Sequence, residues 1–466
     1  MLKRSFARRW VSTTLFILAT TAGSMAAERQ ITNDSTQNCA LDQNHNFSPD
    51  GKWLVYDLRP NGGLQNCRSI EKVNVVTGER VRVYDGPDFV ENMGPGIAAP
   101  SYLPERNEVI FIHGPFTTTG LAYDMARRTG AIVPDDGSAM NDTSRITWAD
   151  ARDVTPPFTP GALRGGTHRH DPGGPGGLWI GYTYNDQIMK RYGQQIGRDL
   201  DLRMLGLTKL GIPVSVDADP AHENRSGAGF SVVITEVFPK DELDREPGTD
   251  RIYRATDDQW VGTRGYRKPD GSWQLARAFI GHMRVRAADG SVRDHREVFI
   301  VDIPEDITRP GPAGPLEGTG TTFPAPPAGT SQRRLTHTES GCFGLVRSTS
   351  DGGMIAFLSR AADGTPQVFV VSPLGGEPRQ ITSFPGGASH PVRWLPDDLH
   401  FVTVSEGRVY VVDAASGCAR AITEPSRSRP DGLVVSPDGK LVAFNREVVY
   451  ASGKFAQVFV ADIELP

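Results

Sequence analysis

Short apolar stretches separated by Pro-Asp-Gly turns recur from one end of the chain to the other. Residues 47–57 read FSPDGKWLVYD and residues 435–445 read VSPDGKLVAFN. The same pattern returns in YLPERNEVIFIH (102–113), KPDGSWQLARAFIG (268–281), TSDGGMIAFLS (349–359) and WLPDDLHFVTVS (394–405). Each copy predicts a β-hairpin, because turn-forming residues separate two stretches rich in β-branched and aromatic side chains.

Two further strands follow most copies of this hairpin. A third strand is predicted from stretches such as RVYVVDAASG (408–417), and a fourth from stretches such as CARAITE (418–424). Four antiparallel strands repeated about every 40–50 residues are the signature of a β-propeller blade. Candidate blades begin near residues 43, 98, 168, 221, 263, 344, 390 and 431, and the fourth is the weakest. We therefore predict an all-β fold, a single β-propeller of seven or eight four-stranded blades.

The last candidate blade lacks its own fourth strand. ERQITND (28–34) closely matches EPRQITS (377–383), which is the fourth strand of an earlier unit. We therefore expect the start of the mature chain to supply the outer strand of the final blade, so that the ring closes without an open edge. The propeller domain then spans 27–466, with long loops at 133–166 and 304–330, and the Pro/Gly-rich second loop is expected to be mobile and without a function of its own.

Residues 1–26 read as a secretory signal peptide. Basic residues precede the apolar run LFILATTAG, and a small-residue cleavage site ends at Ala26. We expect a periplasmic or secreted protein that does not span the membrane, since no other segment is apolar enough. The net charge of −5 and the absence of a basic run disfavour nucleic acid as a partner. A monomer is expected.

The stretch LRGGTHRHD (163–171) carries two histidines one residue apart, and strand alternation would place both on one face. Counting back from each turn aligns Gln43, His168, His390 and Asp431 at one level of the channel, with His45 and His170 one layer below. Imidazole, carboxylate and amide ligands suit Mn²⁺, Zn²⁺ or Ca²⁺, so these four residues are candidate metal ligands. The alternative is that they are polar lining of a solvated channel.

Other polar side chains are expected on the same face, after the second strands and in the loops that enter the ring. The candidate substrate-binding residues are Asp57, His113, Tyr184, Asn185, Asp186, Arg264 and His282, and the candidate catalytic residues are His170, Arg164 and Arg59. Guanidinium groups suit carboxylate ligands. For each residue singly, the alternative is an ordinary polar loop tip.

The four cysteines can be placed by the same register. Cys39 precedes the first strand of the first blade, and Cys67 lies between its second and third strands. Both positions fall on one face, so a Cys39–Cys67 disulfide is predicted. Cys342 and Cys418 fall on opposite faces and are not expected to pair.

The repeated SPDGKWLVY and GGEPRQIT resemble the TolB-like propellers of bacterial periplasms. More narrowly, SPDGKWLVYDLRP, VNVVTGE, FIHGP, DARDVTPPFTPGALRGGTHRH and YTYNDQIM are similar to an uncharacterised family of exported propellers that includes YidR. That resemblance implies a fold and a location, and no activity. A more distant similarity to oligogalacturonide lyases rests on the architecture and on the residue types of Gln43, His168, His170 and His390.

Two functions follow as hypotheses. The first is a metal-assisted lyase that acts on an acidic, uronate-containing saccharide by β-elimination, with loop 133–166 closing over the substrate. In it, the ion neutralises the carboxylate, and His170 or Arg164 takes the proton. The rival is a non-enzymatic propeller that binds an envelope protein through the same channel mouth. Saccharide binding without catalysis is a third possibility.

Overall fold

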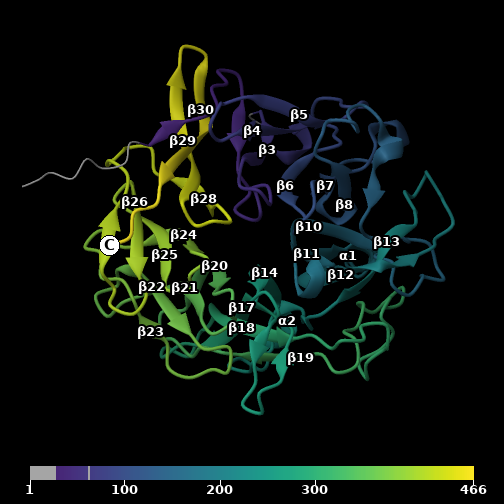
Figure 1. Ribbon diagram of the computed structural model, residues 1–466. Coiled ribbons are helices and arrows are strands. Elements are labelled where there is room, and N and C mark those ends of the chain that lie inside the picture. The colour runs from purple at the N-terminus through teal and green to yellow at the C-terminus, as the bar shows by residue number, and fades with distance from the viewer. Residues whose placement is uncertain (1–27, 61–62) are drawn as a thin grey trace, which may run out of the picture.

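Seven four-stranded antiparallel sheets stand around one axis in a computed structural model of the protein (Figure 1). The structure describes residues 28–60 and 63–466. The predicted signal peptide, 1–26, lies outside the described residues. Within the described part of the chain, no helix has the length and apolar character needed to cross a lipid bilayer.

The first three blades are formed by residues 38–233. Blade 1 consists of β2 (Asn38–Ala40), β3 (Trp53–Arg59), β4 (Ser69–Asn74) and β5 (Arg80–Asp85). Blade 2 consists of β6 (Ala98–Tyr102), β7 (Glu108–His113), β8 (Thr129–Pro134) and β9 (Thr147–Trp148). Blade 3 consists of β10 (Gly165–Gly173), β11 (Trp179–Asp186), β12 (Arg203–Val214) and β13 (Gly227–Val233), with helix α1 (Gln187–Ile196) between β11 and β12.

Four more blades complete the ring. Blade 4 consists of β14 (Arg254–Trp260), β17 (Ala276–Arg286), β18 (Val292–Asp302) and β19 (Ser331–Arg334), and the short helix α2 (Lys240–Leu243) precedes it. Blade 5 consists of β20 (Cys342–Ser348), β21 (Ile355–Arg360), β22 (Pro366–Val371) and β23 (Arg379–Gln380). Blade 6 consists of β24 (Ser389–Trp394), β25 (His400–Ser405), β26 (Arg408–Asp413) and β27 (Ala419–Ala421). Blade 7 consists of β28 (Asp431–Val435), β29 (Leu441–Tyr450), β30 (Gly453–Asp462) and β1 (Arg29–Gln30).

The Ser-Pro-Asp-Gly turns form because their side chains bind their own backbone. Asp50 Oδ1 accepts from the Ser48 hydroxyl at 2.7 Å and from the Lys52 amide at 3.1 Å. Gly51 takes a φ of 70°, which favours glycine. Ser436, Asp438 and Lys440 repeat these bonds in blade 7. The local sequence therefore fixes the hairpins before any blade packs on another.

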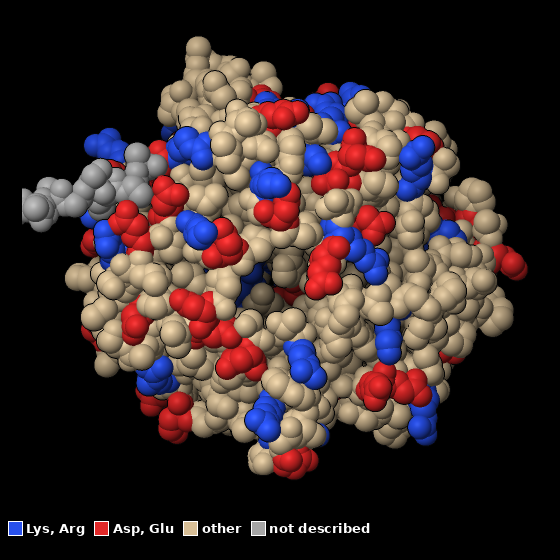
Figure 2. All heavy atoms as spheres, viewed as in Figure 1, with Lys and Arg blue, Asp and Glu red and all other residues tan. Residues whose placement is uncertain are grey.

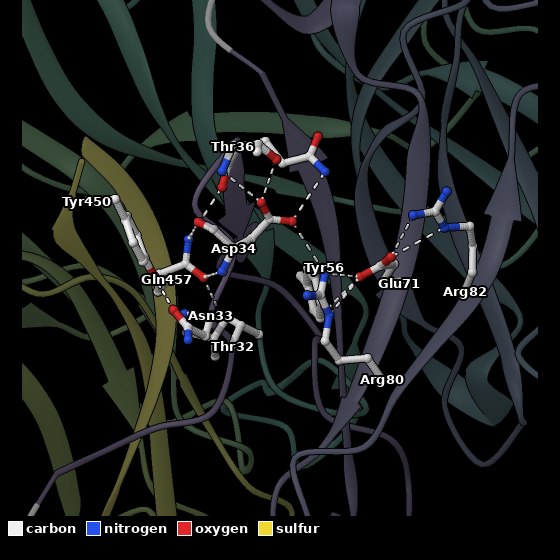
Figure 3. Close-up of polar contacts among 12 residues, drawn as sticks. Thr32, Asn33, Asp34, Thr36, Tyr56, Glu71, Arg80, Arg82, Tyr450 and Gln457 are labelled. Atoms are coloured by element: carbon white, nitrogen blue, oxygen red, sulfur yellow. Dashed lines mark hydrogen bonds and ion pairs between the residues drawn. The ribbon is translucent and has the colours of Figure 1, made fainter. Parts of the chain in front are cut away.

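The N-terminal strand closes the ring, as predicted. In blade 7, Arg29 pairs with Val460 and Gln30 with Phe459. Beyond β1, Gln457 accepts hydrogen bonds from the Thr32 hydroxyl and the Asp34 amide at 3.0 and 2.9 Å (Figure 3). Residues 32–34, which follow β1, thus hold blade 7 beside blade 1. A second network of hydrogen bonds and ion pairs surrounds Glu71 of blade 1 (Figure 3).

The ring has seven blades, one fewer than the eight candidate units. The unit near 221 is not a blade, because its strands are β13, the outer strand of blade 3, and β14, the inner strand of blade 4. The unit near 263 supplies β17, β18 and β19 of blade 4, and it begins with a two-stranded hairpin, β15 (Tyr266–Arg267) and β16 (Trp273–Gln274), inserted between β14 and β17. Its Pro-Asp-Gly turn resembles the repeat in sequence but lies outside the four-stranded sheet.

The two long loops are packed against the ring. Loop 304–330 buries Ile307, Leu316 and Ala325, which are 1–4 % exposed, so its apolar side chains attach it to the ring. In loop 133–166, residues 147–148 form β9, and Asp150 pairs with Gly229 beside β13. This segment therefore lies against the outer strand of blade 3 rather than over the channel.

Candidate functional site

A cavity of about 780 Å³ lies at the channel mouth, on the face where the inner strands begin. It extends over the junction between blades 7 and 1. We call it the upper mouth. Its charged and polar lining includes Asp42, Gln43, Arg59, His168, Arg169, Arg427, Arg429, Asp431, Arg446 and Glu447. In Figure 2 the centre of the ring is hollowed, and Lys or Arg atoms lie within the hollow.

The inner strands share a β-bulge, and counting residues back from each turn did not take this bulge into account. One residue near the start of six of them has a positive φ, namely Gln43, Ala99, Arg169, Asp257, Gly344 and Gly432. In β10 the pairing shifts between His168, which opposes Thr183, and Asp171, which opposes Gly181. The bulge adds one residue and breaks strict alternation. At the level of His168 and Asp431 the first blade therefore places Asp42, and Gln43 aligns with Arg169 instead.

The two histidines of THRH consequently do not share a face. His168 lines the upper mouth. His170 is 0 % exposed, packs against the ring of Tyr182, and shares a hydrogen bond of 2.9 Å between its Nε2 and the Thr167 hydroxyl. Burial lowers the pKa of His170 to about 3. The structure therefore places His170, the predicted catalytic base, inside blade 3 and not in the upper mouth.

Three of the four predicted metal ligands line the upper mouth. Gln43 Nε2 donates to Asp431 Oδ1 at 3.3 Å, and His168 lines the same cavity. His390 belongs to β24, but its side chain lies outside the described part of the structure. Among the described residues, no three His, Cys, Asp or Glu side chains gather in a group that could hold an ion.

His168 is held in a form that does not suit a metal ligand. Its Nδ1 lies 2.8 Å from Nη1 of Arg128. A guanidinium can only donate, so Nδ1 is the acceptor and Nε2 carries the proton of the neutral ring. Burial, and then Arg128, lower the pKa of His168 well below its usual value, so the ring is neutral at pH 7. His168 thus offers an N–H group, and the donor set as described does not fit a divalent cation.

Arg59 and Arg169 are the arginines best placed to meet a ligand. Arg59 is 31 % exposed and makes a two-pronged ion pair with Asp57 at 2.6 and 2.9 Å. Asp57, predicted to bind substrate, is fully buried and also accepts from the Ala99 amide, so the structure gives it the role of a support for Arg59. Arg169 is 22 % exposed and lies 3.7 Å from Asp42.

Three other predicted residues form a buried group in blade 3. Arg164 is 1 % exposed, its Nε donates to Asp186 at 2.8 Å, and its remaining donors bind the carbonyls of Thr319 and Thr322 in loop 304–330. Asp186 also caps α1 and accepts from Tyr184 at 3.0 Å. Arg164, Tyr184 and Asp186, for which catalytic and binding roles were predicted, therefore hold a loop and a helix in place and do not line the upper mouth.

The other predicted binding residues do not line the upper mouth. Arg264 is exposed in the hairpin between β14 and β17, on the opposite face, and stacks on Trp273. Asn185 donates to Asp201 at 2.8 Å beside a separate cavity of about 600 Å³. His282 contacts the Thr256 hydroxyl at 3.0 Å within blade 4. The second strands diverge from the propeller axis, so residues predicted at a similar height along that axis do not come together.

His113 is enclosed by aromatic rings rather than by a ligand site. It is 0 % exposed, its Nδ1 donates to the Gly114 carbonyl at 2.6 Å, and Phe116 and Trp148 lie at ring-centre distances of 4.8 and 5.4 Å. Burial lowers the pKa of His113 to about 4. This histidine, predicted to contact substrate, packs inside blade 2 and does not line the upper mouth.

The buried state of His113 makes stability depend on pH. Below pH 6.5 the unfolded chain protonates this ring, while the folded protein does not until about pH 4, so unfolding is favoured as pH falls through that window. We expect His113→Asn to lose about 2 kcal/mol less unfolding free energy between pH 7 and pH 5 than the wild type. Urea unfolding at both pH values measures this, with the exposed His222→Asn as control. Equal losses in all three proteins would contradict the assignment.

The predicted Cys39–Cys67 disulfide is absent, and all four cysteines are free thiols. Cys39 packs with Leu41, Val458 and other residues between blades 7 and 1. Cys67 packs with Ala98, Ala99 and Ile112 toward blade 2. The two thiols therefore belong to different hydrophobic clusters, Cys39 on β2 toward blade 7 and Cys67, just before β4, toward blade 2.

Sequence reasoning missed Asp42, Arg169, Arg427, Arg429 and Arg446. Strict alternation turned Arg169 away from the histidines, and only the bulge brings it inward. The loop EPSRSRPDG (424–432) did offer a signal, since it enters an inner strand and carries two of these arginines.

The protein is a closed seven-bladed β-propeller with an arginine-rich cavity over the junction between blades 7 and 1. Residues 96–224 match the family described as "Protein of unknown function (DUF3748)". The chain is 35% identical over 431 residues to the uncharacterized protein YidR of Escherichia coli (strain K12), covering 90% of this chain and 94% of that protein. It belongs to the YidR family.

Two solved structures share the fold over nearly the full length. An oligogalacturonate lyase in complex with manganese has a TM-score of 0.54 at 14% identity, covering 95% of this chain and 94% of that chain. An oligogalacturonate lyase from Vibrio parahaemolyticus has a TM-score of 0.53 at 12% identity, covering 95% of each chain. At such identities these likenesses establish the fold.

Proposed function

We propose that the protein is an exported propeller that binds an acidic saccharide in the upper mouth and cleaves it by β-elimination. The observation that carries this proposal is the charge of the cavity. Five arginines and three carboxylates line it, so it favours an anionic ligand. Its volume of about 780 Å³ lies in the range of small-ligand sites, on the order of 300–1,000 Å³, and leaves room for more than one sugar ring.

In this proposal, Arg59 and Arg169 hold the uronate carboxylate. A guanidinium matches a carboxylate in shape, and both side chains are partly exposed to the cavity. Pairing the carboxylate with two cations stabilises negative charge that develops at the adjacent carbon when its proton leaves. The Nε2–H of His168 is placed to donate a hydrogen bond to the sugar.

Asp42 is the proposed proton acceptor. It lies between Arg59 and Arg169, at 3.8 and 3.7 Å, and its Oδ2 makes no hydrogen bond. Burial raises the pKa of Asp42 above its usual value, which strengthens it as a base. The carboxylate takes the proton from the carbon beside the uronate group, a carbon–carbon double bond forms, and the glycosidic bond to the leaving sugar breaks. Water protonates the leaving oxygen.

The metal predicted at Gln43, His168, His390 and Asp431 enters no step of this proposal, because the described donors do not fit a divalent cation and Nδ1 of His168 accepts a hydrogen bond from Arg128. Metal content of protein purified without chelator, compared with a His168→Ala/His390→Ala variant, decides the matter. Equal content in both would remove the metal site.

The reaction itself is tested with oligogalacturonides and other polyuronates. The expected result is an ultraviolet-absorbing unsaturated product that wild-type protein forms and Asp42→Asn does not, while Asp42→Asn still binds the saccharide. Binding without product in the wild type would leave a saccharide-binding propeller. Neither binding nor product, with an envelope protein retained in a pull-down, would support the non-enzymatic alternative.

A further inference from the structure

Below the upper mouth, three arginines from three blades cross the channel to one segment of blade 1. Arg169 of blade 3, Arg347 of blade 5 and Arg393 of blade 6 each donate from Nη2 to a backbone carbonyl. The three acceptors are the successive carbonyls of residues 42–44, at 3.1, 2.9 and 3.1 Å. The three guanidinium groups therefore lie close together at the centre of the ring. We call this cluster the neck.

The neck and the charged side chains that adjoin it hold more positive than negative charge. Arg277 forms ion pairs with both Asp171, at 3.1 Å, and Asp258, with which it is in direct contact. Asp42 faces Arg169. Counting Arg169, Arg277, Arg347 and Arg393 against Asp42, Asp171 and Asp258 gives four cations and three anions.

Arg347 and Arg393 carry this excess. Among the described residues, neither has a carboxylate within 4 Å. Both are buried, at 2 % and 9 % exposed. Carbonyl groups accept their hydrogen bonds but bring no neutralising charge, and a buried charge without a partner is costly.

Two donors in this group are also left without an acceptor. Nε of Arg347 and Nη1 of Arg277 are buried and make no hydrogen bond to the protein, and Oδ2 of Asp42 and of Asp171 accepts none. Burial and the nearby Arg393 lower the pKa of Arg347 well below its usual value, and burial and Arg169 lower that of Arg393 to about 9. Asp171 acts in the opposite direction on both pKa values, but it does not cancel the effect of burial and of the neighbouring arginines.

We propose that the neck binds one small monoanion, a halide or a carboxylate group, between Arg347 and Arg393. A single negative charge there balances the count and gives the buried guanidiniums a partner. The anion has two possible sources. It is either a free ion from solution or the carboxylate of a saccharide that enters from the upper mouth, which shares Arg169 with the neck. The site does not depend on the proposed lyase reaction.

Two measurements test the site on the full mature chain. In crystals soaked in sodium bromide, we expect an anomalous difference peak in contact with both guanidiniums. In solution, we expect a saturable rise in Tm with sodium bromide or sodium acetate at constant ionic strength. Arg347→Gln and Arg393→Gln should bind the anion about 10- to 100-fold more weakly, since each removes a hydrogen bond to a charged group. Arg360→Gln and Arg420→Gln, exposed on the same two blades, are the matched controls.

The outcomes separate the two sources. A response to bromide or acetate that is lost in the neck variants identifies a free anion. A response to galacturonate alone, lost in the same variants, identifies the carboxylate of a bound sugar. If wild-type crystals show no peak, and neither acetate, bromide nor galacturonate raises Tm, the proposal is overturned, whether or not the variants fold.

Discussion

Replacing Arg59 and Arg169 together with glutamine is expected to weaken binding of an oligogalacturonide about 100-fold. Each arginine offers a charge-assisted, two-pronged contact, and the loss of such a contact costs about 1.5–3 kcal/mol. Isothermal titration calorimetry at low salt measures the change, since the exposed part of this attraction is screened at high salt.

The control for this prediction is Arg106→Gln, an exposed arginine in the β6–β7 turn that does not line the cavity. Because Arg59→Gln leaves buried Asp57 without its cation, the single variant Arg169→Gln and a Tm for each protein accompany the double variant. Unchanged saccharide affinity in a folded double variant would remove the upper mouth as the binding site.

The second prediction concerns stability. Arg277→Met is expected to lower the unfolding free energy by about 3–5 kcal/mol, because it leaves Asp171 and Asp258 buried without their shared cation. Burial alone would raise the pKa of Asp171, and Arg277 instead holds it well below its usual value. The variant also loses the stacking of Arg277 on Trp260. Urea unfolding measures the difference.

A matched substitution and a partial rescue sharpen this test. Arg267→Met, exposed in the hairpin of the same blade, should change stability by less than about 0.5 kcal/mol. Adding Asp258→Asn to Arg277→Met should restore part of the loss, since one unpaired charge is removed. A loss below about 1 kcal/mol for Arg277→Met would show that water, rather than the arginine, solvates the two carboxylates.

Much of the fold could be predicted because its signals are local. In the Ser-Pro-Asp-Gly turns, side chains such as Ser48 and Asp50 form hydrogen bonds within the turn, so the local sequence is enough to predict the hairpin. The match between residues 28–34 and an outer strand likewise predicted ring closure. The number of blades was left open because the fourth candidate unit was weak, and its two strands, β13 and β14, belong to blades 3 and 4 in the structure.

The candidate site was predicted only in part. Gln43, His168, Asp431 and Arg59 do line one cavity. Counting from each turn placed them near one level, although the bulge offsets Gln43 from His168 and Asp431 by one residue. His113, His170 and Arg164 were placed near the site, although each turns into the core. Elevation along a strand does not decide whether a side chain faces the axis or the next blade, and one extra residue reverses that choice.

The sequence by itself determined the repeating hairpins, the closed ring and the chain segments that surround its axis, because short-range turn chemistry and strand pattern encode them. The tertiary structure alone decided which side chains meet. A left-handed residue at Arg169 turns this arginine into the channel and His170 out of it. Arg347 and Arg393, far from residues 42–44 in sequence, converge on that segment only when the ring closes. The charge of the mouth and of the neck is therefore a property of the closed ring, since it arises from contacts between blades and not within them.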